Sequence, residues 1–329
     1  MQAALTTMAS AAKRLLVLNP NTSSAFTEKI ARVAARCAIP DAVEIETAQP
    51  KTGPRSIESV YDELLSAVPS LEAYLEHAAA RRIDGVVVAC FSDHPVQQAL
   101  REVGGRAAVV GLLDASLAAA SLAGDRVGIV TTSAGWEPLL RSGVDRLGYG
   151  DRCRQIVAVG APVLALEGDD DELASRVCEA AARVAASSDV VILGCAGMGP
   201  LATRVEAALG GAAAVVEPVE AAVRACASLA LQGLGSSAAR PLFQHHAGPL
   251  SPLLAGAYAS RGAAPEAPSP EAPSPAVDDY ALSYYDDYAS PTAPSTPPPT
   301  TRPPPSMPPG LDDGGDVLLS FDDYVNPRS

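Results

Sequence analysis

Two of the six cysteines occupy matching places in the chain. Cys90 and Cys195 lie 105 residues apart, and each stands just after a short apolar run typical of a buried strand. One thiolate can remove a proton from a carbon acid while a thiol on the opposite face returns one, because a cysteine pKa of roughly 8.5 lies within reach of neutrality. Two facing thiols can therefore invert a stereocentre, and the backbone N–H groups that follow each would stabilise an enolate-like intermediate.

The other four cysteines show no such pattern. Cys37, Cys178 and Cys226 fall within helical spacings, so we expect them to pack as small hydrophobic side chains. Cys153 is expected in a polar loop without partners. Because no Cys-x-x-Cys pair is present and the spacing suits neither zinc nor a disulfide scaffold, we expect free thiols, no metal site and a reduced cytoplasmic protein.

The elements that must position the two cysteines form a repeated series of strands and helices. Apolar runs predict strands at 14–18, 43–47, 84–89 and 107–110, and again at 126–130, 190–193 and 213–216. Helical spacing predicts helices at 24–37, at 56–80 with a break near Pro69, and at 115–122, 172–186 and 218–230. Equivalent segments recur after 105 to about 112 residues, which predicts two similar lobes.

We therefore predict an α/β fold of two lobes, about 13–115 and 125–225, between which the chain ends can cross over. Each lobe would contain a mainly parallel sheet flanked by helices. Ligands of such sheets bind beyond the carboxyl ends of the strands, where Asn19 and Thr131 stand with the two cysteines. One active-site cleft between facing lobes would bring all four together.

Composition separates this globular region, 13–240, from a flexible N-terminus, 1–12, and a tail, 247–329. The tail holds 18 of the 29 prolines, three Asp-Asp-Tyr copies and a net charge of −8 out of −14. Such a composition cannot bury enough apolar surface to offset chain entropy, so we predict a disordered tail. The acidic balance excludes a broad nucleic-acid surface, and no apolar run is long enough to predict a membrane span. The expected ligand is a small molecule.

Three sequence strings, taken in order, resemble the hydantoin racemase branch of the aspartate/glutamate racemase superfamily. They are Asn-Pro-Asn-Thr-Ser at 19–23, Ala-Cys-Phe-Ser-Asp at 89–93 and Leu-Gly-Cys-Ala-Gly-Met at 193–198. The segment that begins at Glu217 resembles the acidic segment near the end of the family's domain. The resemblance covers roughly residues 13–235 and implies a cofactor-independent racemase with Cys90 and Cys195 as acid and base. It also implies assembly into a homo-oligomer.

The same resemblance implies a set of residues around the substrate. Side chains and backbone amides would come from Asn19, Ser92, Asp93, Thr131, Thr132, Ala196, Gly197, Met198 and Glu217. One departure concerns His94, which stands before Pro95 where the family commonly continues directly from Asp to Pro. His94 is thus either a catalytic partner of Cys90 or a hydrogen-bonded bystander, and we expect the first loop to have its own shape.

The expected substrate is a 5-substituted hydantoin or allantoin, whose acidic ring carbon would be inverted as part of nitrogen metabolism. The Cys-Asn-Thr string of the amino-acid racemases is missing at both cysteines, and the small apolar residues after Cys195 suit an uncharged ring. None of the lysines of the globular region, Lys13, Lys29 and Lys51, ends a buried strand, which argues against a Schiff-base cofactor. The sequence contains no phosphate-binding glycine motif either.

Two alternatives stay open. The first is an amino-acid racemase, or an activity like that of a maleate isomerase or a malonate decarboxylase, with one or both thiols acting on an acyclic acid. The second is a catalytically inactive member of the superfamily that binds a protein partner through the acidic tail. The three Asp-Asp-Tyr copies motivate this second reading.

Overall fold

The computed structural model describes residues 11–103 and 105–235. The predicted tail, 247–329, with its three Asp-Asp-Tyr copies, lies outside the described residues, as does nearly all of the predicted N-terminal segment. The flexibility predicted for the N-terminal segment, the disorder predicted for the tail and the boundaries of the globular region stay predictions. No helix among the described residues is both long and apolar enough to cross a membrane.

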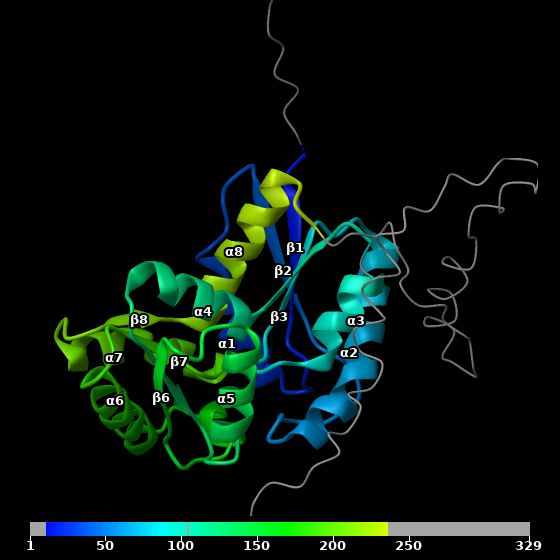
Figure 1. The fold of residues 1–329 in the computed structure, drawn as a ribbon. Helices are drawn as coiled ribbons and strands as arrows, with labels where there is room; N and C mark the ends of the chain where they lie inside the picture. The colour runs from blue at the N-terminus through cyan, green and yellow to red at the C-terminus, as the bar shows by residue number, and fades with distance from the viewer. Residues whose placement is uncertain (1–10, 104, 236–329) are drawn as a thin grey trace, which may run out of the picture. The chain divides into compact units, whose positions relative to one another are not determined.

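Two four-stranded parallel sheets with the same strand order form the framework (Figure 1). The first has the order β2–β1–β3–β4, with strands β1 (Lys13–Leu18), β2 (Val43–Ala48), β3 (Gly85–Val88) and β4 (Ala108–Gly111). The second has the order β6–β5–β7–β8, with strands β5 (Val127–Thr131), β6 (Cys153–Ala158), β7 (Val190–Leu193) and β8 (Ala214–Val216). The predicted pair of similar α/β lobes is confirmed.

The central strands are buried along their whole length. Every residue of β3, β5 and β7 is buried, because helices cover both faces of each parallel sheet. Continuous β-branched runs are the sequence signature of such strands, which is why β3 and β7 were predictable. Strand β6 was not, because exposed Arg154 and half-buried Gln155 interrupt its apolar pattern near the start. The prediction that Cys153 lies in a loop was therefore wrong: it begins β6 and is buried.

Eight α-helices and two 3-10 helices connect the described strands. They are α1 (Ser24–Ala35), α2 (Val60–Ala80), α3 (Pro95–Val103), α4 (Leu112–Ala123), α5 (Trp136–Arg146), η1 (Val163–Glu167), α6 (Asp171–Ala185), η2 (Ala196–Leu201), α7 (Ala202–Leu209) and α8 (Pro218–Gln232). The predicted break at Pro69 does not occur, and α2 continues through it. The proline leaves the carbonyl of Leu65 without its helical partner, and Leu65 is 48% exposed, where water can satisfy that carbonyl.

The fourth helix of each lobe packs on the sheet of the other lobe. Helix α4 follows the first sheet but lies against β5, β7 and β8, whereas α8 ends the second lobe and lies against β1, β3 and β4 (Figure 1). At Gly85 a side chain would collide with the Cys226 sulfur, so this glycine permits the close approach of α8 to β3. The exchange produces one central core with members from both sheets, among them Val87 and Ile192. The two lobes are thereby interlocked.

Polar contacts from the η1 region add a second connection between the lobes. The Lys29 ammonium of α1 is buried and donates to the carbonyls of Leu166, at 2.9 Å, and Gly168, at 3.1 Å. The Glu58 carboxylate accepts hydrogen bonds from the backbone N–H groups of Val163 and Leu164. These contacts hold the loop that carries η1 against the first lobe.

Replacement of Lys29 should destabilise the protein through this connection. In Lys29→Met the carbonyl of buried Leu166 loses its donor, whereas exposed Gly168 can bind water, and we expect a loss of roughly 1–3 kcal/mol in the free energy of unfolding. Lys51→Met is the matched control, because Lys51 pairs with Glu76 at an exposed site and such pairs contribute about 0–1 kcal/mol. Urea denaturation measures both. Equal stability of the two variants would contradict this role for Lys29.

Candidate active site

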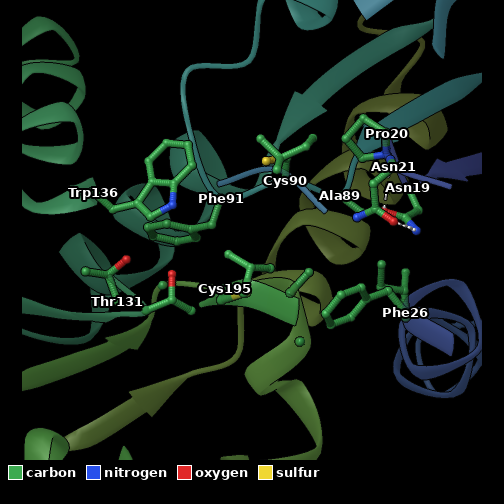
Figure 2. Close-up of a pocket in the computed structure, with 17 residues that line it drawn as sticks. Asn19, Pro20, Asn21, Phe26, Ala89, Cys90, Phe91, Thr131, Trp136 and Cys195 are labelled. Carbon is green, nitrogen blue, oxygen red and sulfur yellow. Dashed lines mark hydrogen bonds between the residues drawn. The ribbon is translucent and has the colours of Figure 1, made fainter. Parts of the chain in front are cut away.

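The carboxyl ends of four strands converge on one pocket between the sheets (Figure 2). Asn19 follows β1, Thr131 ends β5, and the two cysteines follow β3 and β7. All four line the pocket, as the topology predicts for parallel sheets that face each other. The pocket contains about 490 Å³ of empty space, its open mouth included, which is at the small end for ligand sites.

The lining is mostly apolar and carries no charged side chain among the described residues. Its polar side chains, apart from the thiols, are Asn19, Asn21, Thr131 and Thr132. Its large apolar side chains are Phe26, Ile30, Ile57, Phe91, Trp136 and Val163. Small residues complete it at Pro20, Ala89, Gly194, Ala196 and Gly197. A pocket of this kind suits a compact uncharged ligand with several hydrogen-bonding groups.

Cys195 stands in a rigid turn that supplies its sulfur with backbone donors. A side chain at Gly194 would come within 2.6 Å of the Val130 carbonyl, so only glycine lets the end of β7 approach β5 so closely. Burial raises the pKa of the Cys195 thiol to about 11 and the charge of Glu58 adds to this, while the backbone N–H groups of Gly197 and Met198 act in the opposite direction. Fixed dipoles therefore stabilise the thiolate form of Cys195.

Cys90 has a different environment. Its sulfur lies 3.3 Å from the Ser92 hydroxyl, and the residue is only partly exposed. Burial raises the pKa of the Cys90 thiol strongly, the negative charge of Glu63 raises it further, and the Ser92 hydroxyl partly offsets both effects. The charge of Cys195 also raises it, so the two sulfurs are electrostatically coupled across the pocket. Cys90 is thus the more firmly protonated of the two.

The first loop of the pocket is organised by Asn19. Its amide nitrogen donates to the Asn21 side chain at 3.0 Å and to the Thr27 hydroxyl at 2.9 Å. Ser23, at the end of this loop, caps α1 by accepting a hydrogen bond from the N–H of Phe26. The loop is consequently fixed before any ligand arrives, and Phe26 is directed toward the pocket (Figure 2).

The hydroxyls of Thr131 and Thr132 are available to a ligand. Both side chains line the pocket, and neither hydroxyl makes a hydrogen bond within the part of the chain that the structure describes. The Thr131 oxygen is visible in Figure 2 on the side of the pocket below Trp136. These hydroxyls can donate or accept, so they suit the carbonyl and N–H groups of a polar ring.

Four residues of the predicted set do not line this pocket. Ser92 is buried behind Cys90, and Asp93 pairs with Arg146 at 2.7 Å on the surface. Met198 is fully buried and approaches the site only through its backbone N–H. Glu217 caps α8, where its carboxylate accepts from the N–H groups of Val219 and Glu220. Glu217 thus supports η2 from behind, because a side chain at Gly199 would touch its carboxylate.

His94 fixes the loop after β3 to α2. Its Nδ1 accepts a hydrogen bond from the Val96 N–H, and its Nε2 lies 2.9 Å from the Ser66 hydroxyl. Burial lowers the pKa of His94 to about 4, which keeps the imidazole neutral. His94 is buried and does not line the pocket. Its contacts are therefore those of a hydrogen-bonded structural residue and not those of a catalytic partner of Cys90.

Sequence reasoning missed the apolar walls and one buried acid. Phe26, Ile57 and Trp136 line the pocket, but on the sequence they read as ordinary core residues of helices and loops. Trp136 is the single tryptophan of the chain, and this was the one sequence feature that could have drawn attention to it. Glu63 lies on a predicted helix, where a carboxylate reads as part of the solvated face, yet it is 5% exposed. No cluster that could hold a metal ion occurs among the described residues.

Comparison with known proteins places these features in context. The family model described as Asp/Glu/Hydantoin racemase matches residues 15–226. The hydantoin racemase of Rhizobium meliloti is 32% identical over 67% of this chain and 90% of its own. The allantoin racemase of Klebsiella pneumoniae is 33% identical and superposes with a TM-score of 0.67, covering 73% of this chain and 96% of its own. The allantoin racemase of Pseudomonas fluorescens is 29% identical, with a TM-score of 0.65 over 71% of this chain and 100% of its own.

Glu217 should make stability fall as pH rises toward neutrality. Burial raises the pKa of its carboxyl from 4.5 to about 7. Between these values the folded protein retains a proton that the unfolded chain has released, so the free energy of unfolding decreases as pH increases. We expect the free energy of unfolding of the wild type, relative to that of Glu217→Gln, to fall by about 3 kcal/mol between pH 4.5 and pH 8.

Urea denaturation across this pH range measures the effect of Glu217. Glu206→Gln, at an exposed position of α7, is the control for the same substitution at the surface. A pH-independent difference for Glu217→Gln would show that the Glu217 carboxyl titrates normally.

Proposed function

The chain belongs to the Asp/Glu/hydantoin racemase family, and on this premise we propose that it inverts the acidic ring carbon of a 5-substituted hydantoin or of allantoin, with Cys90 and Cys195 as acid and base. One observation carries the proposal. The two thiols stand at equivalent strand ends of two similar lobes and line one uncharged pocket. Inversion by two bases requires proton donors and acceptors on opposite faces of one carbon.

The proposed reaction needs one thiolate and one thiol. With Cys195 as the thiolate, its sulfur takes the proton from the ring carbon, and the electron pair of the broken C–H bond moves into the adjacent carbonyl as an enolate. Cys90 then gives its S–H proton to the opposite face, which leaves Cys90 as the thiolate and Cys195 as the thiol. The other enantiomer follows the same steps in reverse. Backbone N–H groups near Cys195 support the first step because they stabilise its thiolate.

The absence of charge in the described lining favours a ring over an amino acid. An amino-acid carboxylate in a mostly apolar pocket needs a cationic partner, since a buried unpaired charge is costly. None of the described lining residues is Lys, Arg or His. A hydantoin ring is neutral and presents carbonyl and N–H groups, which match the free hydroxyls of Thr131 and Thr132. The acyclic-acid alternative therefore has less support.

Loss of either pocket thiol should abolish inversion. We expect Cys90→Ser and Cys195→Ser to lower the rate of racemisation by about 10²–10⁴-fold each, the usual contribution of a general acid or base. Proton NMR in deuterated water on single enantiomers measures exchange and inversion separately. Exchange without inversion should survive in one variant, which retains the base for one face. Cys178→Ser, on α6 outside the pocket, is the control and should keep full activity. Full racemisation by both single variants would contradict the two-thiol mechanism.

The substrate panel tests the preference for a ring. We expect turnover of allantoin or a 5-alkyl hydantoin and none of aspartate or glutamate, because the described lining provides no cation for a second carboxylate. The same NMR assay with no-enzyme controls measures it, since hydantoins exchange slowly unaided. Turnover of an acyclic acid alone would favour the alternative of an amino-acid racemase or a related activity. No turnover of any compound would favour the alternative of a catalytically inactive binding protein.

A further inference from the structure

One buried carboxyl near the pocket has no assigned role. Glu63 belongs to the first turn of α2, is 5% exposed, and one of its oxygens, Oε1, has no hydrogen-bond partner among the described residues. A buried acid without full hydrogen bonding is destabilising, so its presence needs a compensating reason. Burial raises the pKa of Glu63, and the Asp93 charge raises it as well, while the Ser92 hydroxyl acts in the opposite direction.

Ser92 connects this carboxyl to Cys90. Its hydroxyl lies 3.3 Å from the Cys90 sulfur, and it also acts as a hydrogen-bond donor that lowers the pKa of the Glu63 carboxyl. A hydroxyl has a single hydrogen to donate, so it serves either the sulfur or the carboxyl at one time. The loop that carries Cys90 and Ser92 is held against this part of α2 by hydrogen bonds, because the Ser66 hydroxyl lies 2.9 Å from His94 Nε2 and donates to the Glu63 carbonyl at 2.9 Å. The three groups therefore form one chain from α2 to the pocket.

We propose that Glu63 is a positioning residue that sets the protonation state of Cys90 through the Ser92 hydroxyl. When Glu63 is protonated, it donates to Ser92, and the Ser92 hydroxyl donates to Cys90 and stabilises the thiolate. When Glu63 is a carboxylate, it accepts the Ser92 hydrogen instead, and its negative charge favours the neutral thiol. The proposal deepens the two-thiol mechanism and rests on Cys90 acting as one of its bases.

The asymmetry of the two cysteines supports this role. Cys195 has fixed backbone donors from Gly197 and Met198, and these act whatever the protonation of the surroundings. Cys90 is stabilised instead by a hydroxyl whose hydrogen can turn. A two-base racemase must release a proton from each sulfur in turn, so the sulfur without fixed donors needs a group that responds to its charge. Glu63 is placed to supply that response.

Other charged and titratable groups around Glu63 leave this arrangement intact. Asp93 is paired with Arg146 at 2.7 Å on the surface, and its charge still raises the pKa of Glu63. His94 binds Ser66, one turn along α2, and stays neutral because burial lowers its pKa to about 4. Cys90 itself is the remaining titratable group that acts with Glu63. Ser92 and Asp93 thus act on the protonation of Glu63, and the charge of Glu63 in turn raises the pKa of Cys90.

The experiment measures the reactivity of Cys90 without any substrate. Full-length protein is treated with iodoacetamide at pH 9, and the alkylation rates of Cys90 and Cys195 are followed separately by peptide mass spectrometry. Only thiolates react, so the rate rises about tenfold for each unit by which the thiol pKa falls. Glu63→Gln keeps a donor for Ser92 but removes the charge. We expect about tenfold faster alkylation of Cys90 and an unchanged rate at Cys195.

Two further variants sharpen the result. Ser92→Ala removes the donor to the sulfur and should slow alkylation of Cys90 several-fold, which tests the proposal even if Glu63→Gln does not fold. Glu72→Gln, nine residues further along α2, is the matched control and should leave both rates unchanged. In racemisation assays, Glu63→Gln should shift the pH profile of kcat/KM to lower pH, an effect that a purely structural role would not produce.

Each outcome separates this proposal from the proposed function. An unchanged Cys90 rate in folded Glu63→Gln, or in Ser92→Ala, overturns the role of Glu63 even in an active racemase. A changed rate in a protein that turns over no hydantoin or allantoin supports the coupling of Glu63 to Cys90 and refutes the proposed substrate class instead. Equal changes at both cysteines would indicate a general loosening of the pocket and would also overturn it.

Discussion

The exchange of α4 and α8 between the two sheets is the packing constraint on which the site depends. Each helix closes the other lobe's sheet, so neither lobe can bury its apolar face alone. The shared core fixes the angle at which the carboxyl ends of the strands face one another. Because close-packed cores resist deformation, the spacing of two thiols that belong to different lobes becomes as well defined as a spacing within one sheet. The two-thiol chemistry proposed for the cleft depends on this fixed spacing.

Electrostatics then makes two chemically identical side chains unequal. Both thiols are held in a pocket that penalises charge, and the protein offsets this penalty differently on the two sides. Cys195 has backbone dipoles that oppose the charge of Glu58, whereas Cys90 has a hydroxyl that opposes the charge of Glu63. Similar lobes place both sulfurs symmetrically, but the loops that follow the strands are specific to each half. The fold therefore supplies the geometry, and the loops determine which sulfur more readily loses its proton.

The sequence predicted the framework because its strongest signals belong to the most buried elements. The apolar runs at 84–89 and 190–193 correspond to β3 and β7, and their ends locate both cysteines. The patterns did not predict α3, α5, α7 or β6. Helix α5 is interrupted on the sequence by Pro138 and Gly143, and the short α3 and α7 have few periodic positions. The central strands were thus predictable, whereas the edge strand β6 and the short peripheral helices acquire their structure from packing that local patterns do not encode.

The same reasoning explains which site residues escaped prediction. Asn19 and Thr131 follow from topology, because every strand of a parallel sheet ends at the same edge. The roles of Phe26, Trp136 and Glu63 depend on where helices from separate parts of the chain come together, and a single sequence carries no record of that contact. Glu63 illustrates the difference: its burial results from the docking of α2 beside the loop that follows β3, a loop whose shape His94 helps to fix. A carboxylate that would be unremarkable on a solvated helix thereby becomes a charge that acts on a pocket thiol. Residues that tune such a site are consequently found in the contacts between elements, while the reacting groups themselves can be found at the ends of strands.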